Sequence, residues 1–295
     1  MNKYLIFRTD RIGDFLLTLI LIKCIKRNDK KSYIVIVSSE KNYHYIKTFN
    51  FVDEVIKLKP NFFSRISVIN QLRRHTFKIT IIHDGKNRSK FINFFLKKNK
   101  SIFINNDDIK SSHFSKIKKI IHSLNFSFDN SDLNILENPN FSYNKKDFII
   151  LHYDEKWSVN TYISEYQNIE PSDEQLLDFI NKIILKSNHN LVITTGIVTP
   201  PILKKIFLRT NSNIKLIEGL NFMQLQEIVS QSKLLISCHG AISHVASAYN
   251  IKQIDIIDVN LKNPYSNWTS HFRNYFPVYR KNFKNLSAEI LSLLN

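Results

Sequence analysis

Apolar runs of strand length alternate with helix-length segments along most of this chain, and this alternation narrows the possible folds more than any other feature. Continuous apolar strands are typical of sheets buried on both faces, and strands that alternate with helices pair in parallel. In the first half, the sequence predicts strands at residues 4–7, 32–38, 54–58, 78–83 and 102–104, and helices at 15–26, 43–49, 64–74, 89–97 and 110–124. We therefore expect an α/β fold with a doubly wound parallel sheet.

A polar stretch interrupts this series. Residues 125–146 are rich in Asn, Asp and Ser without a clear period, which is typical of an interdomain linker. A second series then predicts strands at 148–152, 191–195, 214–217, 233–237 and 253–257, and helices at 171–186, 200–209, 222–230, 242–249 and 286–294. Because 295 residues is long for a single core, we expect two Rossmann-like domains, residues 1–146 and 147–295.

A charged loop with one glycine joins the first predicted strand to the first helix. It contains Asp10, Gly13 and Asp14 and lies at the carboxyl end of the strand, where open α/β sheets bind ligands. Gly13 lets the backbone turn tightly or approach a ligand. Asp14 has two explanations that its position alone does not separate: a cap for the following helix, or a general base.

Three segments carry a family resemblance. The run from Arg8 to Thr18, with Gly13-Asp14 at its centre, resembles the opening of the bacterial heptosyltransferases, the glycosyltransferases of family nine. Residues 81–89 are similar to the family's strand and loop ending in Arg-Ser, and residues 225–249 to its donor-site segment. The resemblance implies the GT-B architecture, in which two Rossmann-like domains face each other across a cleft. It also implies inverting, metal-independent transfer of a sugar, heptose or related, from a nucleotide-sugar to a lipopolysaccharide or other cell-envelope glycan, with Asp14 as general base.

The expected donor site lies in the second domain. In the family a lysine just before a tryptophan contacts the donor phosphates, and Lys156-Trp157 matches that pair. A lysine there would stabilise the charge that develops on the leaving phosphate; the alternative is a surface lysine beside an anchoring tryptophan. The loop His239-Gly240-Ala241 precedes a helix, whose first amides lack partners and can hold an anion.

Other donor-side candidates have ordinary structural explanations as well. Thr195 and Gly196 could bind phosphate or ribose, or could simply form a β-to-α turn. His244 could contact the donor or be a buried helix histidine. His239 occupies the position where the family carries an acidic residue, a departure that suits a more acidic donor, such as one carried on CMP.

The first domain is expected to bind the acceptor. The candidate residues are Arg8, Asp10, Arg11, Gly13, Lys86 and Arg88. Part of the formal charge of +17 reflects lysine-rich composition, and the remainder suggests a polyanionic partner, either nucleic acid or the anionic inner leaflet. Residues 91–98 predict an amphipathic basic helix, which is either a solvated helix with one core face or a docking surface for a membrane-bound phosphorylated glycolipid. We favour an anionic glycolipid or glycan acceptor, with peripheral contact to the inner membrane and no nucleic acid.

Several chemistries lack their motifs. The sequence has no zinc-ligand spacing, no D-x-D pair, no P-loop and no G-x-G-x-x-G, so we expect neither a metal nor another cofactor. Two cysteines do not make a disulfide framework, and the apolar run 15–25 is too short to span a bilayer. We expect a cytoplasmic protein, with contact to the inner face of the cytoplasmic membrane. The alternatives are a transferase of the same fold that uses CMP-Kdo or another nucleotide-sugar, and a non-catalytic glycan- or nucleic-acid-binding protein.

Overall fold

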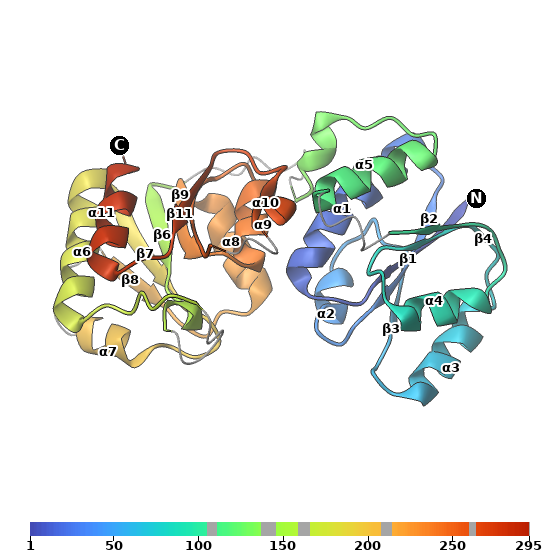
Figure 1. The fold of residues 1–295 in the computed structure, drawn as a ribbon, viewed down its shortest axis with the longest axis horizontal. Helices are drawn as coiled ribbons and strands as arrows, with labels where there is room; N and C mark the ends of the chain where they lie inside the picture. The colour runs from blue at the N-terminus through green and yellow to red at the C-terminus, as the bar shows by residue number, and fades with distance from the viewer. Residues whose placement is uncertain (105–110, 137–145, 159–165, 208–213, 260–263, 295) are drawn as a thin grey trace. The chain divides into compact units, whose positions relative to one another are not determined.

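The chain folds into two compact units. The computed structural model describes residues 1–104, 111–136, 146–158, 166–207, 214–259 and 264–294 (Figure 1). The first unit comprises Met1–Ile135 and Ser266–His271, and the second comprises Leu136–Tyr265 and Phe272–Asn295. The first unit therefore ends before the boundary that the sequence suggested at 146. It also includes the short segment Ser266–His271 from near the end of the chain. The expected cleft between the domains stays a prediction.

The first unit is built on five parallel strands. They are β1 (Lys3–Arg8), β2 (Tyr33–Ser38), β3 (Glu54–Lys57), β4 (Phe77–Ile82) and β5 (Lys98–Phe103), in the order β3-β2-β1-β4-β5. Its helices are α1 (Ile12–Asn28), α2 (Tyr43–Ile46), α3 (Phe62–Leu72), α4 (Asn87–Phe94) and α5 (His113–Ser123). Leu5 and Phe7 of β1 share a buried cluster with residues of α3 and α4, and α1 packs with α5 on the other side of the sheet (Figure 1).

The second unit repeats the plan with six parallel strands. They are β6 (Phe148–His152), β7 (Asn190–Thr194), β8 (Ile214–Ile217), β9 (Leu234–Cys238), β10 (Lys252–Ile257) and β11 (Tyr275–Tyr279), in the order β11-β10-β9-β6-β7-β8. Its helices are α6 (Asp173–Ser187), α7 (Pro201–Phe207), α8 (Phe222–Gln231), α9 (Ala241–Ala248) and α11 (Phe283–Ser292), with a 3-10 turn at Glu155–Trp157. Both sheets have the Rossmann strand order, which confirms the predicted fold class of two doubly wound parallel sheets.

Two of the edge strands, β5 and β11, differ from the predicted elements, whereas the edge strands β3 and β8 match them. The helix expected over 89–97 ends at Phe94, and β5 begins at Lys98 rather than at 102. Because β5 is an edge strand, its polar residues reach solvent and the continuous apolar signal is missing. The ammonium of Lys98 donates to the carbonyls of Asn93 and Leu96, which terminates α4. A second edge strand, β11, contains Pro277 and was not predicted; proline is tolerated there because one side of an edge strand forms no ladder.

The expected linker is partly ordered within the first unit. Residues Asn130–Leu133 form a 3-10 turn that packs against α1, and the guanidinium of Arg27 pairs with the buried carboxylate of Asp132 at 2.8 Å. The short helix α10 (Ser266–Thr269) packs on α5, with the ring of Trp268 5.2 Å from that of His113. None of the helices in the described ranges is long and apolar enough to cross a membrane.

Candidate functional site

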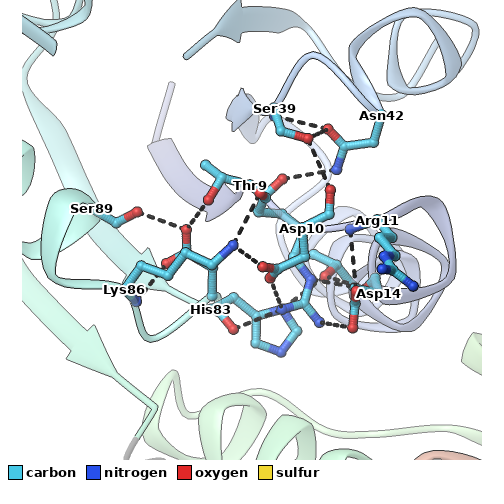
Figure 2. Close-up of polar contacts among 12 residues, drawn as sticks. Thr9, Asp10, Arg11, Asp14, Ser39, Asn42, His83, Lys86 and Ser89 are labelled. Atoms are coloured by element: carbon cyan, nitrogen blue, oxygen red, sulfur yellow. Dashed lines mark hydrogen bonds and ion pairs between the residues drawn. The ribbon is translucent and has the colours of Figure 1, made fainter. Parts of the chain in front are cut away.

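In the first unit, the segments 8–18 and 81–89, which the sequence analysis singled out, meet at one point of the sheet. The strand order reverses between β1 and β4, and ligands of open α/β sheets bind at such a switch point, outside the carboxyl ends of the strands. β1 leads into the loop Thr9–Arg11, and β4 leads into the loop that carries His83 and Lys86 (Figure 2). A cavity of about 390 Å³ opens here. It is lined by Thr9, Asp10, Arg11, Asp14, Ser39, Glu40, Lys41, Leu58, Pro60, Lys86 and Arg88.

Asp14 acts as a helix cap and also lines the cavity. Its carboxylate Oδ2 accepts a hydrogen bond from the amide of Arg11 at 3.2 Å (Figure 2). Its Oδ1 lies 3.9 Å from the guanidinium of Arg8. The Asp14 side chain is 29% exposed and reaches the cavity. The cap explanation is therefore confirmed, and the carboxylate is still accessible to a ligand.

Arg8 connects the loop Thr9–Arg11 to the start of α1 and to the loop after β4. The residue is only 4% exposed, and its guanidinium donates to the carbonyls of Asp14 and His83, both at 2.9 Å, and to the Asp10 carboxylate at 3.2 Å. These bonds make Arg8 a positioning residue. Gly13, another acceptor candidate, lies in the first turn of α1.

The basic residues of the second motif reach across to the first. The Lys86 ammonium forms an ion pair with Asp10 and donates to the carbonyl of Thr9 at 3.1 Å. Arg88 donates to the same carbonyl at 3.1 Å and to the Thr9 hydroxyl at 2.7 Å. The Thr9 hydroxyl in turn donates to the buried carboxylate of Asp84 at 2.6 Å. Four of the expected acceptor residues, Asp10, Arg11, Lys86 and Arg88, thus lie around one cavity.

Two histidines near Asp14 were not among the sequence candidates. His83 is buried beside the Thr18 hydroxyl at 2.8 Å, and burial followed by the charge of Arg8 holds the pKa of its ring well below the usual range. Burial also lowers the pKa of His113 to about 4, with Arg8 again contributing. His83 directly follows β4 and could have been inferred from that position. Nothing in the local sequence around His113 indicates that α10 covers it.

In the second unit, the strand order reverses between β6 and β9, and the predicted donor loops follow those two strands. The Lys156 side chain is only 12% exposed, and its ammonium lies 2.7 Å from the carboxylate of Asp154. A Cβ placed on Gly240 would be 2.7 Å from the same ammonium nitrogen. Lys156 is therefore held against the loop before α9, which the sequence analysis proposed as the phosphate site, and it is not a surface lysine.

Asp154 anchors Lys156 from inside the unit. Burial alone would raise the pKa of this carboxyl, but the His152 ring and the Lys156 ammonium outweigh burial and hold the pKa well below its usual range. The His152 ring lies 3.6 Å from the carboxylate through Nε2 and 2.9 Å from the Thr194 hydroxyl through Nδ1. Asp154 and His152 were not among the sequence candidates, although His152 is the last residue of β6 and Asp154 follows it in the loop.

His239, which occupies the position where an acidic residue was expected, is paired with a buried carboxylate. Its Nδ1 lies 2.6 Å from the carboxylate of Asp255, which is completely buried in β10. Asp255 also accepts from the hydroxyls of Ser243 at 2.7 Å and Tyr275 at 3.1 Å. An acidic group is thus present behind the ring, one strand away from its expected place in the sequence.

The remaining donor candidates are Thr195, Gly196 and His244, and each contacts neighbouring groups of the protein. The Thr195 hydroxyl donates to the carbonyl of Gly196 at 3.1 Å, and a Cβ on Gly196 would collide with the carboxylate of Glu155 at 2.5 Å. His244 is buried in α9, with its ring 5.0 Å from that of Phe272 and edge-on to it, in keeping with the buried-histidine explanation.

Two further side chains support the Lys156 loop. Trp157 is fully buried, stacks on Tyr153 at 4.8 Å and donates to the carbonyl of His152. Arg280, which was not among the sequence candidates, is buried and donates to the carbonyl of Lys156 at 2.8 Å. The described residues include no group of three or more His, Cys, Asp or Glu that could hold a metal ion.

Comparison with other proteins gives matches only at the level of structure. No protein-family model matches the chain, and no curated protein does. The heptosyltransferase WaaC of E. coli, solved with ADP-2-deoxy-2-fluoro heptose, has a TM-score of 0.72 at 13% identity, covering 98% of this chain and 99% of that one. A glycosyl transferase of family 9 from Veillonella parvula has a TM-score of 0.65 at 11% identity, covering 95% and 86%.

A third solved structure carries a different activity in its name. The UDP-GlcNAc 2-epimerase of Methanocaldococcus jannaschii has a TM-score of 0.58 at 11% identity, covering 100% of this chain and 92% of that one. Identities this low show a shared fold and leave the activity to be argued from the site. The chain has the GT-B-type fold, with two Rossmann-like units.

Proposed function

We propose that the protein is an inverting glycosyltransferase that moves a sugar, heptose or related, from a nucleotide-sugar to a hydroxyl of a cell-envelope glycan, without a metal ion. The observation that carries this proposal is the position of Lys156. A largely buried ammonium lies beside Gly240, at the start of α9, and the N-terminal end of a helix favours an anion. A cation and a helix N-terminus at one place suit the phosphates of a nucleotide-sugar.

The charge of Lys156 is most useful while the glycosidic bond breaks. The bond from the anomeric carbon to the phosphate oxygen breaks with both electrons going to the nucleotide, so negative charge grows on that phosphate. A fixed ammonium stabilises this charge more in the transition state than in the bound donor, and therefore accelerates the reaction. In this proposal Lys156 does the work that a divalent cation does in metal-dependent transferases.

Asp14 is proposed as the base on the acceptor side. Its carboxylate takes the proton of the acceptor hydroxyl as the oxygen forms a bond to the anomeric carbon, on the face opposite the leaving phosphate. Positioned base catalysis contributes roughly 10²–10⁴-fold. The four cationic side chains that line the cavity, Arg11, Lys41, Lys86 and Arg88, outnumber its carboxylates and suit an anionic glycan or glycolipid.

The similarity to solved heptosyltransferases supports this proposal, because E. coli WaaC was solved with ADP-2-deoxy-2-fluoro heptose and with ADP. A thermal-shift screen with ADP, CMP, UDP and GDP identifies the nucleotide that the second unit binds. A ligand present at 100 times its Kd stabilises by about 2.7 kcal/mol. If no nucleotide shifts the midpoint, the donor site is wrong.

Transfer from ADP-heptose to truncated lipopolysaccharide then tests the base. We expect Asp14→Asn to lower kcat by at least ~10²-fold while nucleotide affinity is unchanged, because the amide cannot take a proton. Asp10→Asn is the matched control, since Asp10 lines the same cavity. If Asp10→Asn abolishes transfer and Asp14→Asn retains it, Asp14 is only a cap and the base is Asp10.

A further inference from the structure

Two neighbouring helices of the first unit direct large apolar side chains outward. α3 and α4 pack together and lie side by side (Figure 1), and their inner sides contribute Val68, Ile69 and Ile92 to the core. Six exposed side chains on and beside these helices form what we name the α3–α4 face: Phe62, Phe63, Ile66, Phe91, Phe94 and Phe95. Phe63 is 82% exposed and Phe94 is 78% exposed.

The side chains of the α3–α4 face form connected groups. The Phe95 ring lies 5.1 Å from that of Phe91 and 5.2 Å from that of Phe94. Arg73, just after α3, places its guanidinium 6.0 Å from the Phe95 ring and donates to the Phe95 carbonyl at 3.5 Å. The ends of the two helices are therefore tied together. Several exposed aromatic rings in one region indicate an interaction site, whereas single exposed apolar residues do not.

The surroundings of the face are almost exclusively cationic. Residues 57–103 contain 12 Lys and Arg but only one acidic residue, Asp84, which is buried and accepts from the Thr9 and Ser89 hydroxyls. Exposed cations close to the face in sequence include Arg73, Arg74, Lys90 and Lys97. Within the described parts of the chain, none of these four forms an ion pair with a carboxylate. This one segment supplies most of the excess positive charge of the protein.

We propose that the α3–α4 face docks the protein onto an anionic lipid bilayer. Exposed phenylalanines can enter the boundary between headgroups and acyl chains, while neighbouring lysines and arginines contact the anionic headgroups. The combination matters, because aromatic side chains alone would suit any apolar partner, and cations alone would suit any polyanion. A bilayer offers both an apolar layer and a sheet of negative charge at the depth that separates them.

The face adjoins the cavity that contains Asp14. Leu58 and Pro60 line that cavity and lead directly into α3, and Lys86 lines it and immediately precedes α4. Docking would thus bring the cavity close to the bilayer surface, where the sugars of a glycolipid acceptor lie. Only this last consequence depends on the proposed transferase function; lipid binding itself does not.

Vesicle flotation without any donor tests the docking. We expect the wild-type protein to float with phosphatidylcholine vesicles that contain phosphatidylglycerol, and to remain unbound with phosphatidylcholine alone. Phe63→Ser combined with Phe94→Ser should weaken binding about tenfold or more. Leu185→Ser is the matched control, because Leu185 is 81% exposed but lies on α6 of the second unit; it should float like the wild type.

Charge reversal tests the cationic half of the proposal. Arg74→Glu combined with Lys90→Glu should abolish flotation, and added salt should weaken wild-type binding, because exposed charges are screened. The same two reversals at Lys204 and Lys215, which are exposed in the second unit, should have a much smaller effect.

Several results would overturn the proposal. These are failure of the wild type to bind anionic vesicles, unchanged binding by the phenylalanine variant, or an equal loss in the Leu185 control. Without vesicle binding, loss of RNA affinity or of a wild-type dimer in the phenylalanine variant would assign the face to that partner instead. If the phenylalanine variant melts early, the charge reversals and the salt dependence decide. A retained thermal shift with nucleotide in each variant separates failure of docking from failure of the donor site.

Discussion

Replacing Gly240 with alanine perturbs the proposed donor site at a single contact. The added Cβ would lie 2.7 Å from the Lys156 ammonium nitrogen and 3.5 Å from its Cε. The nitrogen must therefore withdraw by about 0.7 Å to reach an ordinary contact of 3.4 Å. The backbone itself is undisturbed, because Gly240 has φ −179° and ψ −164°, an extended conformation that alanine also adopts.

The expected loss is functional. A charge-assisted hydrogen bond contributes about 1.5–3 kcal/mol, so a displaced ammonium should lower kcat/KM roughly 10- to 100-fold. The thermal midpoint should stay the same or rise slightly, because alanine reduces the entropy of the unfolded chain. Weaker binding of the nucleotide product, measured by calorimetry, should accompany the loss.

A double-mutant cycle identifies the cause. Lys156→Met retains the aliphatic part of the side chain and removes the nitrogen that the new Cβ would meet. In that background Gly240→Ala should cost less than about twofold, giving a coupling free energy near the whole single-mutant effect. An equal loss in both backgrounds would refute the reasoning, because alanine would then act through the loop backbone and not through Lys156.

Three other predictions concern different parts of the molecule. Transfer should persist in EDTA, whereas Lys156→Met should slow turnover by roughly 10-fold or more; activity restored only by magnesium would contradict this. His239→Asp should lower the thermal midpoint by placing a carboxylate beside buried Asp255, and adding Asp255→Asn should recover most of it; an unchanged midpoint in the single variant would show that the pair carries no charge conflict. Burial lowers the pKa of His113 to about 4 and of His271 to about 3, so both are neutral when folded, and the stability that this contributes is complete above pH 6.5 and is lost as the pH falls towards those values. Urea unfolding at pH 5 should therefore show a loss of about 1–2 kcal/mol per histidine relative to pH 7, and His271→Gln should reduce that pH dependence.

The sequence predicted the central strands and the edge strands β3 and β8 well, but it predicted the edge strands β5 and β11 poorly. β1, β6 and β9 are buried on both faces, so each reads as an unbroken apolar run. β5 and β11 form a ladder on one side only, so polar residues and a proline are tolerated and the signal is lost. The α3–α4 face was not predicted for a different reason. Periodicity indicated an amphipathic helix near Phe91, but it could not show that α3 lies beside that helix.

The site was predictable where its residues follow strands in sequence. Lys156 and Gly240 were both predicted from loops that leave neighbouring strands, and the structure brings them into contact. Asp255 was not among the sequence candidates, because it lies within β10, where a buried carboxylate needs partners that only the tertiary structure supplies. Arg280 was missed for a similar reason, because the strand that precedes it was not predicted.

The two explanations of Asp14 are compatible once its two oxygens are considered separately. Oδ2 accepts from the amide of Arg11 at 3.2 Å, which fixes the carboxylate at the start of α1. Oδ1 is 3.9 Å from the Arg8 guanidinium, longer than a hydrogen bond, so this ion pair orients the group without occupying a lone pair of Oδ1. A carboxylate held in this way has little rotational freedom to lose when an acceptor hydroxyl arrives, and this preorganisation is what a base at a cavity wall requires. The cap therefore supports the proposed base and does not compete with it.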